Sequence, residues 1–333
     1  MTQHGRRTLR DVAAAAGVSE MTVSRVLSGR GTVSERTRAR VRAAVDEMGY
    51  VRNRLAGSLT RARSDQVAVV IPSLVNAIFD EVIDGVGMEL SRADYNPVIG
   101  ISNYDAAREE ALIRSMLSWR PAGVILPAIG HTERTAAMLY AAGVPIVEIM
   151  NTGRPTAAIA VGFDQRRAGA ALGRHLMSRG RQRIGWVGLD HRDLSASARL
   201  EGLRAAVRDA AEVVAPRGTE AGPITLAGGR DGLAALLTAR PDLDAVVFAN
   251  DTAAAGGMMH CLASGIAVPD RLALVGFGGL LSGQALPQRL TTVAAPRREI
   301  GRRAAHCILR SLEGAAVDRI NDMGFELVVG ETT

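Results

Sequence analysis

The sequence predicts an α/β protein with an N-terminal three-helix unit that contains a helix-turn-helix, followed by two lobes of doubly wound parallel sheet. Three observations support this fold class. Two short helical patterns meet at a glycine within residues 8–28. Beyond residue 64, apolar strand patterns alternate with amphipathic helical patterns, which is typical of parallel sheets covered on both faces. Positive charge is concentrated in the first 63 residues.

The helix-turn-helix is predicted from its helix ends. Thr8 can cap a first helix, and Asp11, three residues later, can reach back to it. Gly17 provides the tight turn, and Ser19 can cap a second helix. A second helix of this kind fits the major groove of DNA. The contact between the two helices is expected from Leu9, Val12, Ala13, Val18, Val23 and Val26.

A third helix is expected to begin after Ser34 and to end at about Met48, closed by Gly49-Tyr50. Its inward positions are Val41, Ala44, Val45 and Met48. Residues 1–50 therefore form the first predicted domain. A short, weakly helical segment, residues 51–63, joins it to the remainder of the chain.

Charge distinguishes the two parts of the chain. Residues 1–63 carry 13 arginines against five acidic residues, whereas the remaining residues carry 27 arginines against 29 acidic residues. Positive charge gathered in one small unit is typical of a module that binds phosphates, with contacts that weaken as salt rises. The alternative interpretation is a solvated basic arm that has no partner.

Composition excludes several function classes. The 333 residues include no lysine, which excludes a phosphate-loop or Schiff-base lysine. Cys261 and Cys307 are far apart, which fits buried thiols in a reducing compartment. The six histidines lack metal-ligand spacing, and no apolar run has the length of a membrane span. We therefore expect a cytoplasmic protein without metal, cofactor or catalytic site.

The α/β part is predicted from alternating patterns. The strand patterns cover residues 66–72, 96–101, 122–127, 144–149, 158–163, 183–188, 223–227, 244–249 and 271–276. The helical patterns cover residues 77–92, 105–119, 132–142, 165–179, 196–211, 229–239, 252–264. The alternation restarts at residue 158, so we expect two lobes of similar size. Small ligands bind at the carboxyl ends of parallel strands and between domains, so a cleft is expected there.

Several short segments carry a resemblance to a known family. In the first part they are Asp11-Val-Ala, Ala16-Gly-Val-Ser, Thr22-Val-Ser-Arg-Val-Leu27, Gly49-Tyr50 and Asn53-Arg54-x-Ala56-x-x-Leu59. Further on they are Arg199-Leu-x-Gly202, Asn250-Asp251, Gly265-x-x-Val-Pro269-Asp, Val275-Gly-Phe277 and Leu290-Thr-Thr292. Over essentially its whole length the chain resembles the lactose-repressor (LacI-type) family of bacterial transcription regulators. Within that family it is most similar to repressors of gluconate-utilisation operons, through Ser115-Met-Leu-Ser-Trp119, Val161-Gly-Phe-Asp164 and Gly276-Phe-Gly-Gly279.

The resemblance implies a domain plan. A helix-turn-helix DNA-binding domain spans residues 1–50, a hinge helix spans 51–63, and a two-lobed periplasmic-binding-protein-like domain for effector binding and dimerisation spans 64–333. The expected lobe boundaries are about 64–160 with 293–321 for lobe 1, and about 162–290 with 324–333 for lobe 2. The expected partners are double-stranded operator DNA, a small-molecule effector and a second copy of the chain.

The resemblance also implies DNA contacts on the second helix. Glu20, Met21 and Arg25 are expected to read base edges: Arg25 on a guanine, Glu20 on a cytosine amino group, and Met21 on a thymine methyl. The alternative for Glu20 is a solvated acid favoured by the helix dipole, and the alternative for Arg25 is an ion pair with Asp11. The remaining expected DNA-binding residues of this domain are Thr8, Ser19, Thr22 and Ser24.

In the family the connecting segment becomes a helix on DNA, pairs with its twin in the dimer, and inserts a leucine into the minor groove. Leu59 lies at that position, and Ala56 would let the paired helices approach. Asn53 and Arg54 complete the expected hinge contacts. Arg52 is a departure, because the family usually has proline there.

The expected effector-binding residues are Ser73, Phe79, Asp164, Ser195, Arg199, Asn250 and Gly278. Arg199 suits a carboxylate or vicinal hydroxyls, and Ser195 lies one helical turn before it. The alternative for Arg199 is a surface ion pair with Glu201 or Asp209, and the alternative for Phe79 is a plain core aromatic. Asp164 and Asp251 are either ligand contacts or helix caps, with capping favoured for Asp251.

The effector class is predicted from a departure. Sugar-binding members usually have an acidic residue where this chain has Gly278, and glutamine where it has Ala295. An acid there would repel a carboxylate, so its loss favours an anionic effector such as gluconate. Alternatives are a neutral sugar or a nucleoside, and, in other classes, an α/β enzyme or a sugar-binding receptor. The sequence does not distinguish a repressor from an activator.

Overall fold

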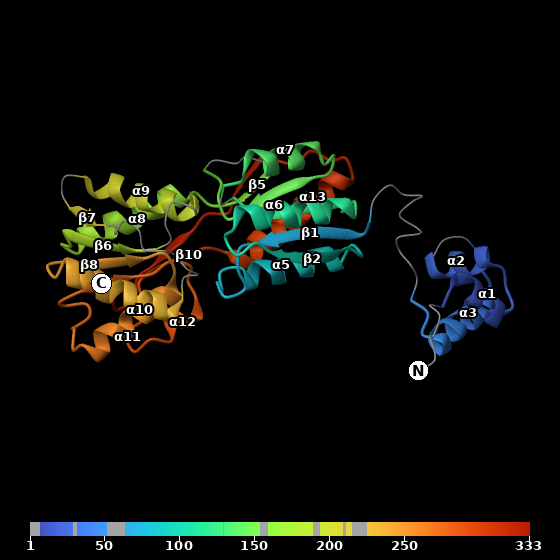
Figure 1. Ribbon diagram of the computed structural model, residues 1–333, viewed down its shortest axis with the longest axis horizontal. Coiled ribbons are helices and arrows are strands. Elements are labelled where there is room, and N and C mark those ends of the chain that lie inside the picture. Colours follow the sequence, from blue (N-terminus) through green and yellow to red (C-terminus); the bar gives the residue numbers. More distant parts are fainter. Residues whose placement is uncertain are drawn as a thin grey trace. The chain divides into compact units, whose positions relative to one another are not determined.

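The computed structural model describes residues 7–28, 32–51, 64–128, 130–153, 159–188, 194–208, 211–214 and 225–333. The chain forms two compact units, Met1–Ser64 and Asp65–Thr333 (Figure 1). Within the described residues, no helix combines the length and apolar character needed to cross a membrane.

The first unit has three helices in its described part, α1 (Leu9–Ala16), α2 (Glu20–Ser28) and α3 (Glu35–Met48). Thr8 and Asp11 form the predicted capping box at α1, and Gly17 ends α1 in the left-handed conformation at φ 61°. The Ser19 hydroxyl accepts the amide of Thr22 at 3.2 Å, which confirms its capping of α2. The predicted apolar residues pack together, with Val12, Val23 and Val41 at the centre.

The predicted third helix is confirmed as well. The Ser34 hydroxyl accepts the amide of Thr37 at the start of α3, and Gly49 ends the helix at φ 58°. Val41 and Ala44 are buried, and Val45 and Met48 pack beside them. The three helices therefore share one small core, which holds α2 so that its opposite side faces outward.

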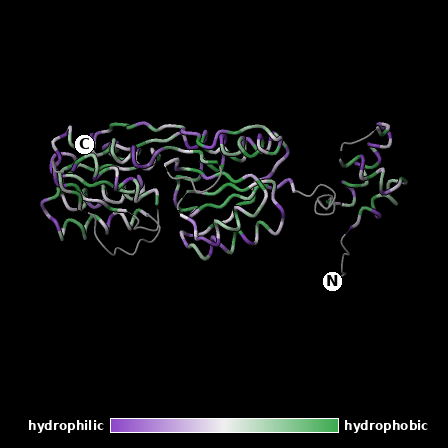
Figure 2. Tube along the Cα trace, turned by 90° about the horizontal axis from the view of Figure 1, so that it is seen from above, coloured by the Kyte–Doolittle hydropathy of each residue, from purple (hydrophilic) through white to green (hydrophobic). Residues whose placement is uncertain are grey.

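In the described part of the second unit, the first sheet has six parallel strands in the order β11-β5-β4-β3-β1-β2. The strands are β1 (Gln66–Ile71), β2 (Asn96–Ile101), β3 (Gly123–Pro127), β4 (Ile146–Ile149), β5 (Ile159–Gly162) and β11 (Ile320–Asp322). One face is covered by α5 (Asp80–Ser91) and α13 (Arg297–Leu312), the other by α6 (Ala106–Ser118) and α7 (Glu133–Ala141). This sheet and its four helices form the first lobe, and Figure 2 shows the apolar strands running through its middle.

The second sheet has four described parallel strands in the order β7-β6-β8-β9. The strands are β6 (Arg183–Val187), β7 (Glu212–Val214), β8 (Ala245–Phe248) and β9 (Ala273–Val275). Helices α8 (Gln165–Ser178) and α9 (Leu194–Val207) cover one face, and α10 (Leu226–Ala239) and α11 (Asp251–Ala263) cover the other. The short α12 (Leu281–Gln284) lies against α11.

Two predicted strands are assigned differently in the structure. The strand predicted at 223–227 is wrong: the Thr225 hydroxyl accepts the amide of Gly228, so Thr225 caps α10 instead. The strand that pairs with β6 at this edge is β7, directly after the predicted helix 196–211, where the sequence analysis predicted no strand. The strand at 158–163 exists as β5, but it pairs with β4 and β11 in the first sheet, so the second lobe begins after it.

The chain passes between the lobes more than once (Figure 1). It leaves the first sheet after β5, returns through β10 (Thr292–Ala294) to α13, and crosses again after β11 to β12 (Glu326–Val328). Strands β10 and β12 pair antiparallel. These crossing segments lie beside the carboxyl ends of strands in both sheets. The amide of Met323, after β11, donates to the Gly162 carbonyl at the end of β5, and Ala294 of β10 bridges to Gly278 after β9.

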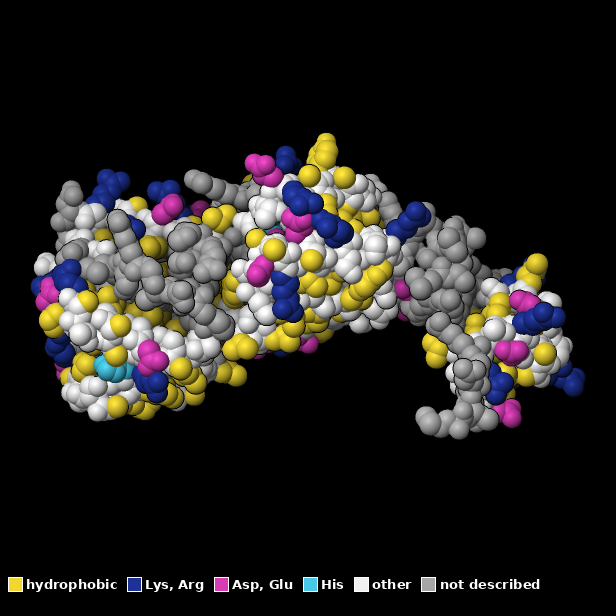
Figure 3. Space-filling view, viewed as in Figure 1, with side chains coloured by type: hydrophobic (Ala, Val, Ile, Leu, Met, Phe, Trp, Pro, Cys, Tyr) yellow, Lys and Arg dark blue, Asp and Glu magenta, His cyan; other side chains and the backbone are white. Residues whose placement is uncertain are grey.

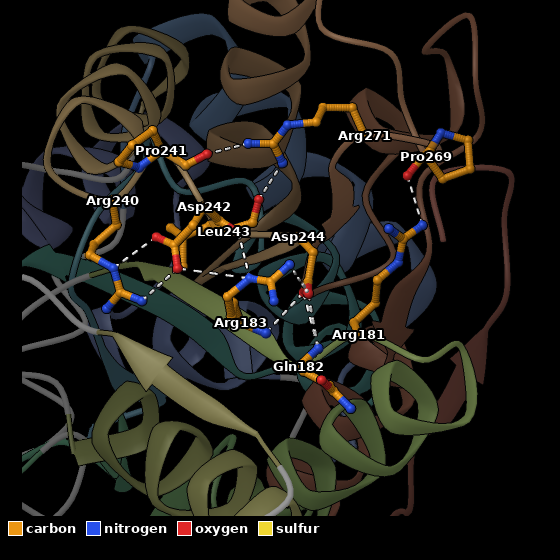
Figure 4. A network of polar contacts seen from close by, with 10 residues as sticks. All are labelled: Arg181, Gln182, Arg183, Arg240, Pro241, Asp242, Leu243, Asp244, Pro269 and Arg271. Carbon is orange, nitrogen blue, oxygen red and sulfur yellow. Dashed lines mark hydrogen bonds and ion pairs between the residues drawn. The ribbon is translucent and has the colours of Figure 1, made fainter.

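The amino ends of β6 and β8 carry a polar network (Figure 4). The backbone amides of Gln182 and Arg183 donate to the Asp244 carboxylate at 3.1 and 3.0 Å, and the Arg183 guanidinium donates to the Asp242 carbonyl at 2.7 Å. Arg271 donates to the carbonyls of Pro241 and Leu243. Because parallel strands share one direction, this network closes the end of the second lobe that is opposite to the carboxyl ends.

Candidate DNA interface and effector cleft

The outward side of α2 carries the side chains predicted to read bases. Glu20 and Arg25 are exposed and the side chain of Met21 is 64% exposed, whereas Val23 and Val26 on the other side are buried. A nitrogen of the Arg25 guanidinium lies 3.4 Å from the Met21 sulfur, so these two side chains adjoin. Arginine side chains protrude from this unit in Figure 3. The helix therefore presents a basic and an apolar side chain next to each other on its exposed side.

The hydroxyls around α2 have local partners. Thr22 and Ser24 are partly buried, and the Thr22 and Ser19 hydroxyls lie 2.9 Å apart. At α1 the Asp11 carboxylate, the proposed alternative partner of Arg25, accepts from the Thr8 amide at 2.8 Å and hydroxyl at 2.9 Å. Hydrogen bonds from Thr8 lower the pKa of Asp11. Thr8 and Ser19 are thus helix caps, and their expected DNA contacts remain predictions.

The predicted hinge contacts, Asn53, Arg54, Ala56 and Leu59, lie outside the described residues, as does Arg52.

Arg199 lies inside the second unit, on α9, with only 5% of its surface exposed. Its guanidinium donates to the Gln165 side-chain oxygen at 2.9 Å and to the Ala249 carbonyl at 3.5 Å. The guanidinium carbon lies 4.1 Å from the centre of the Phe277 ring, a cation–π contact. The alternative of a surface ion pair between Arg199 and Glu201 is therefore wrong: a Glu201 carboxylate oxygen lies 3.9 Å from a guanidinium nitrogen of Arg166. Asp209, the other alternative partner, is outside the described residues.

Close packing of α8 against α9 sets the position of Arg199. A Cβ added at Gly169 would lie 1.9 Å from the Arg199 carbonyl oxygen, so the two backbones approach as near as glycine permits. The side-chain nitrogen of Gln165 donates to the Met150 carbonyl in the other lobe. This bond orients the side-chain oxygen of Gln165 toward Arg199. Ser195, one turn before Arg199, is buried as well.

Asn250 is fully buried at the start of α11 and faces the other lobe. Its side-chain oxygen accepts the amide of Ala253 at 2.8 Å, and its side-chain nitrogen donates to the Asn76 oxygen at 3.4 Å. Asn76 follows β1, and its own side-chain nitrogen donates to the Tyr104 hydroxyl at 2.9 Å. Sequence reasoning missed Asn76 and Tyr104, although both follow the carboxyl ends of strands of the first sheet.

The predicted capping of α11 by Asp251 is wrong, because Asn250 caps this helix. The Asp251 carboxylate accepts from the Thr292 hydroxyl at 2.6 Å and from the Leu280 amide at 2.5 Å, which ties α11 to β10 and to the segment after β9. Burial raises the pKa of Asp251 to about 6, against the opposing effect of these hydrogen bonds. Asp164 does cap its helix, since its carboxylate accepts the Arg167 amide at 2.9 Å.

Gly278 has a backbone conformation that residues with a side chain rarely adopt. Its φ is 125°, its amide donates to the Val293 carbonyl at 2.7 Å, and its carbonyl accepts from the Arg297 guanidinium. Arg297 is buried and pairs with Glu81 at 2.7 Å. An acidic residue at this position would be strained, since few L-residues adopt such a φ. Sequence reasoning missed Arg297, which contacts Gly278 across the two lobes.

The two remaining predicted positions follow β1. Ser73 is buried and its hydroxyl accepts the Val75 amide at 3.0 Å. Phe79 precedes α5 and is buried in the main apolar cluster, which fits the plain core aromatic that was its alternative. The predicted effector residues thus come from the ends of β1, β5, β8 and β9 and from α9, and the Asn76–Asn250 bond links the two lobes among them.

Comparisons with known proteins identify the family to which this architecture belongs. Residues 8–53 match the model of bacterial regulatory proteins of the lacI family, and residues 64–322 match periplasmic binding proteins and the sugar binding domain of the LacI family. The chain belongs to the LacI family. It is therefore a DNA-binding transcriptional regulator rather than an enzyme.

Individual relatives agree with this assignment. The regulator is 38% identical to the HTH-type transcriptional regulator GntR of Pseudomonas aeruginosa, over 99% of this chain and 96% of that protein. A crystal structure of a LacI-family regulator from Silicibacter pomeroyi superposes with a TM-score of 0.89 at 42% identity, over 98% of this chain and 99% of that one. The lac repressor dimer bound to operator and the anti-inducer ONPF has a TM-score of 0.83 at 25% identity, over 98% and 99%.

A second buried polar cluster of the regulator lies between the first sheet and helices α6 and α7. The two ring nitrogens of His131 lie 2.7 Å from a Glu109 oxygen and 3.1 Å from a Glu148 oxygen, and all three side chains are at most 3% exposed. Burial by itself would lower the pKa of His131, but the hydrogen bonds and charges of the two glutamates outweigh it and raise the pKa to about 9. The folded lobe therefore favours the protonated, charged form of His131.

Proposed function

We propose that this regulator is a repressor controlled by gluconate or a related sugar acid bound between its two lobes. The buried guanidinium of Arg199, lying on the Phe277 ring, is the observation that carries the proposal. A guanidinium binds a carboxylate through two parallel hydrogen bonds, and the low dielectric of a buried site strengthens that pair. The neighbouring Gly278 has no side-chain carboxylate that would repel an acid.

The proposed effector residues divide by chemistry. Arg199 would take the carboxylate, and Asn250, Ser195 and Ser73 would contact hydroxyls along the carbon chain. Asp164 would accept from a hydroxyl while it caps α8. Gly278 would add no carboxylate to the site, and Phe79 would support the pocket wall from within the apolar cluster of the first lobe.

For DNA, we propose that Glu20, Met21 and Arg25 read base edges while Thr22 and Ser24 contact phosphates. Exposure of the first three on one side of α2 supports this assignment. Thr8 and Ser19 would add contacts from the helix caps. In the hinge, residues 51–63, Asn53 and Arg54 would contact DNA, and Ala56 would allow the close pairing of two hinge helices that inserts Leu59 into the minor groove.

We further propose that the regulator acts as a homodimer on a near-palindromic operator, since the lac repressor structure reported above is a dimer on its operator. Large apolar side chains at the surface of the second lobe support a dimer surface. Leu281 of α12 and Met259 and Leu262 of α11 are 85%, 51% and 57% exposed. Such residues on adjoining helices favour burial against a partner.

The proposed mechanism is allosteric. Effector binding would shift the arrangement of the lobes, separate the paired hinge helices and release the operator. The effector can move this equilibrium only by its difference in affinity for the two lobe arrangements.

The proposed insertion of Leu59 into the minor groove has its own test. A Leu59→Ala variant should lose specific operator affinity much more than non-specific affinity; equal losses of both would reject the insertion of Leu59.

The effector proposal is tested by calorimetric titration of the purified regulator with gluconate, glucose and a nucleoside. We expect heat of binding with gluconate and none with glucose. Binding of glucose or of the nucleoside without gluconate would reject the sugar-acid proposal and favour the neutral alternative. A promoter-fragment gel shift with and without gluconate then tests release of the DNA, and transcription from the same promoter in the presence of the protein separates a repressor from an activator.

A further inference from the structure

The two lobes are joined by a line of hydrogen bonds that begins at Tyr104, after β2. The Tyr104 hydroxyl accepts from Asn76 at 2.9 Å, Asn76 accepts from Asn250 at 3.4 Å, and Asn250 accepts from the Ala253 amide at 2.8 Å. Tyr104 and Asn76 belong to the first lobe, whereas Asn250 opens α11 of the second. This line, Tyr104–Asn76–Asn250, is called the interlobe relay below.

Backbone donors fix the direction of the relay. The amide of Ile78 donates to the Asn76 oxygen at 3.4 Å, and the amide of Ala253 donates to the Asn250 oxygen. A backbone N–H can only donate, so each side chain must place its oxygen there. The Asn76 nitrogen is thereby directed at Tyr104, and the Asn250 nitrogen at Asn76. Neither amide can rotate by half a turn without losing its backbone bond.

The chain holds Tyr104 in a special conformation to make this contact. Asn103 and Tyr104 both have positive φ, 53° and 57°. Asparagine tolerates this region, but a bulky aromatic residue rarely adopts it, so the surroundings must impose it. The Ser102 amide bonds to the Ile71 carbonyl and the Asp105 amide to the Ser102 carbonyl, which fixes the turn on both sides.

We propose that Tyr104 is a positioning residue for the effector cleft: it fixes the Asn76 amide so that Asn76 holds Asn250, and thereby sets the spacing of the two lobes. The role in effector binding rests on the proposed function, because Asn250 is one of the proposed effector residues. The role in lobe spacing stands independently of any effector. Tyr104 acts through Asn76 and is not itself assigned a contact with the effector.

The lobe spacing is measured first, in the protein without added ligand. Spin labels on introduced cysteines, Tyr140→Cys on α7 and Arg204→Cys on α9, report the distance between the lobes by double electron–electron resonance. The native thiols Cys261 and Cys307 are buried. We expect Tyr104→Phe to broaden the distance distribution and Tyr95→Phe, a change in the same lobe away from the relay, to leave it unchanged. A Tyr104→Phe distribution identical to that of the unaltered protein overturns the proposal.

Calorimetry with gluconate then tests the link to binding. Loss of one neutral hydrogen bond predicts an affinity about 2- to 10-fold weaker in Tyr104→Phe. The same change in an Asn76→Ala background should have no further effect, because the relay is already broken. Tyr140→Phe, whose residue is 95% exposed, is the matched control and should bind as the unaltered protein does. Independent, additive effects of the two substitutions would contradict positioning through Asn76.

The experiments distinguish failure of the sugar-acid proposal from failure of the interlobe relay. If the unaltered regulator binds no sugar acid while Tyr104→Phe still broadens the lobe distance, the proposed effector is wrong and the relay is upheld. If gluconate binds and the lobe distance does not respond to Tyr104→Phe, the relay is wrong and the proposed function is upheld.

Discussion

Replacement of Arg199 by methionine tests the charge argument most sharply. Methionine is unbranched and apolar, so it keeps the packing of the Arg199 stem, but it is shorter and removes both the positive charge and the guanidinium contact with the Phe277 ring. It also leaves the Gln165 oxygen and the Ala249 carbonyl without the guanidinium. Each bond from a charged donor contributes about 1.5–3 kcal/mol, and the longer of the two contributes less. We therefore expect the free energy of unfolding to fall by about 2–4 kcal/mol.

Effector binding should fall much further than stability. Removing one partner of a buried charge pair weakens binding by about 2–5 kcal/mol, which is roughly 30- to 5,000-fold in Kd. Arg199→Lys keeps the charge but, as a compact ammonium, cannot lie flat on Phe277 while bonding both acceptors. We expect this variant to bind gluconate with intermediate affinity.

The assay is titration calorimetry with gluconate on variants shown to be folded by circular dichroism, together with a gel shift on operator DNA. Arg174→Met, at an exposed arginine of α8 in the same lobe, is the matched control. The Arg199→Met variant should hold its operator and no longer release it with gluconate. If folded Arg199→Met binds gluconate within about threefold of the unaltered protein, the buried guanidinium does not hold the carboxylate and the reasoning is refuted.

Three further predictions follow from the same structure. The pKa of His131 is raised to about 9 from an ordinary 6.5, so its ionic network stabilises fully below pH 6.5 and this contribution, about 3 kcal/mol, is lost as pH rises through 9. Urea unfolding from pH 6 to 9.5 should show this fall in the unaltered protein and not in His131→Gln; parallel curves would contradict it. Gly278→Asp should lose gluconate binding more completely than Gly278→Ala, because both strain the backbone at φ 125° but only the first adds a repelling charge. Calorimetry on both variants decides this, and equal losses would leave strain as the sole cause. Arg25→Ala should weaken specific operator binding by about 1–3 kcal/mol with little change on random DNA, measured by fluorescence anisotropy; a uniform loss on both DNAs would assign Arg25 to phosphate contact.

Local signals explain what could be predicted from the sequence. The cap hydroxyls of Thr8, Ser19 and Ser34 accept amides three residues away, and the glycines after α1 and α3 donate their amides to carbonyls three or four residues before them. These roles can therefore be recognised in a short stretch. The buried parallel strands are similarly evident as continuous apolar runs. In the effector site, the family resemblance predicts a role for Arg199, and this side chain is buried in the structure.

The errors involve competition between distant parts of the chain. The apolar run around Thr225 has strand character, but a threonine cap and packing of α10 on α11 make it a helix start. Asp251 adjoins a helix and resembles a cap, yet its carboxylate bonds Thr292, 41 residues away. Asn76, Tyr104 and their partner in the other lobe come from three separate strand ends. No local pattern indicates which of several polar residues after a strand will meet across a cleft.

The central claim is that a sugar acid controls operator binding by this regulator. The most direct measurement is the fluorescence anisotropy of a labelled fragment from upstream of its own gene, titrated with the full-length protein at fixed salt, without sugar, with gluconate and with glucose. We predict tight specific binding that gluconate weakens by at least about tenfold, the usual size of allosteric coupling, while glucose leaves it unchanged. Operator affinity that is unaffected by gluconate, or lowered by glucose instead, would contradict the claim.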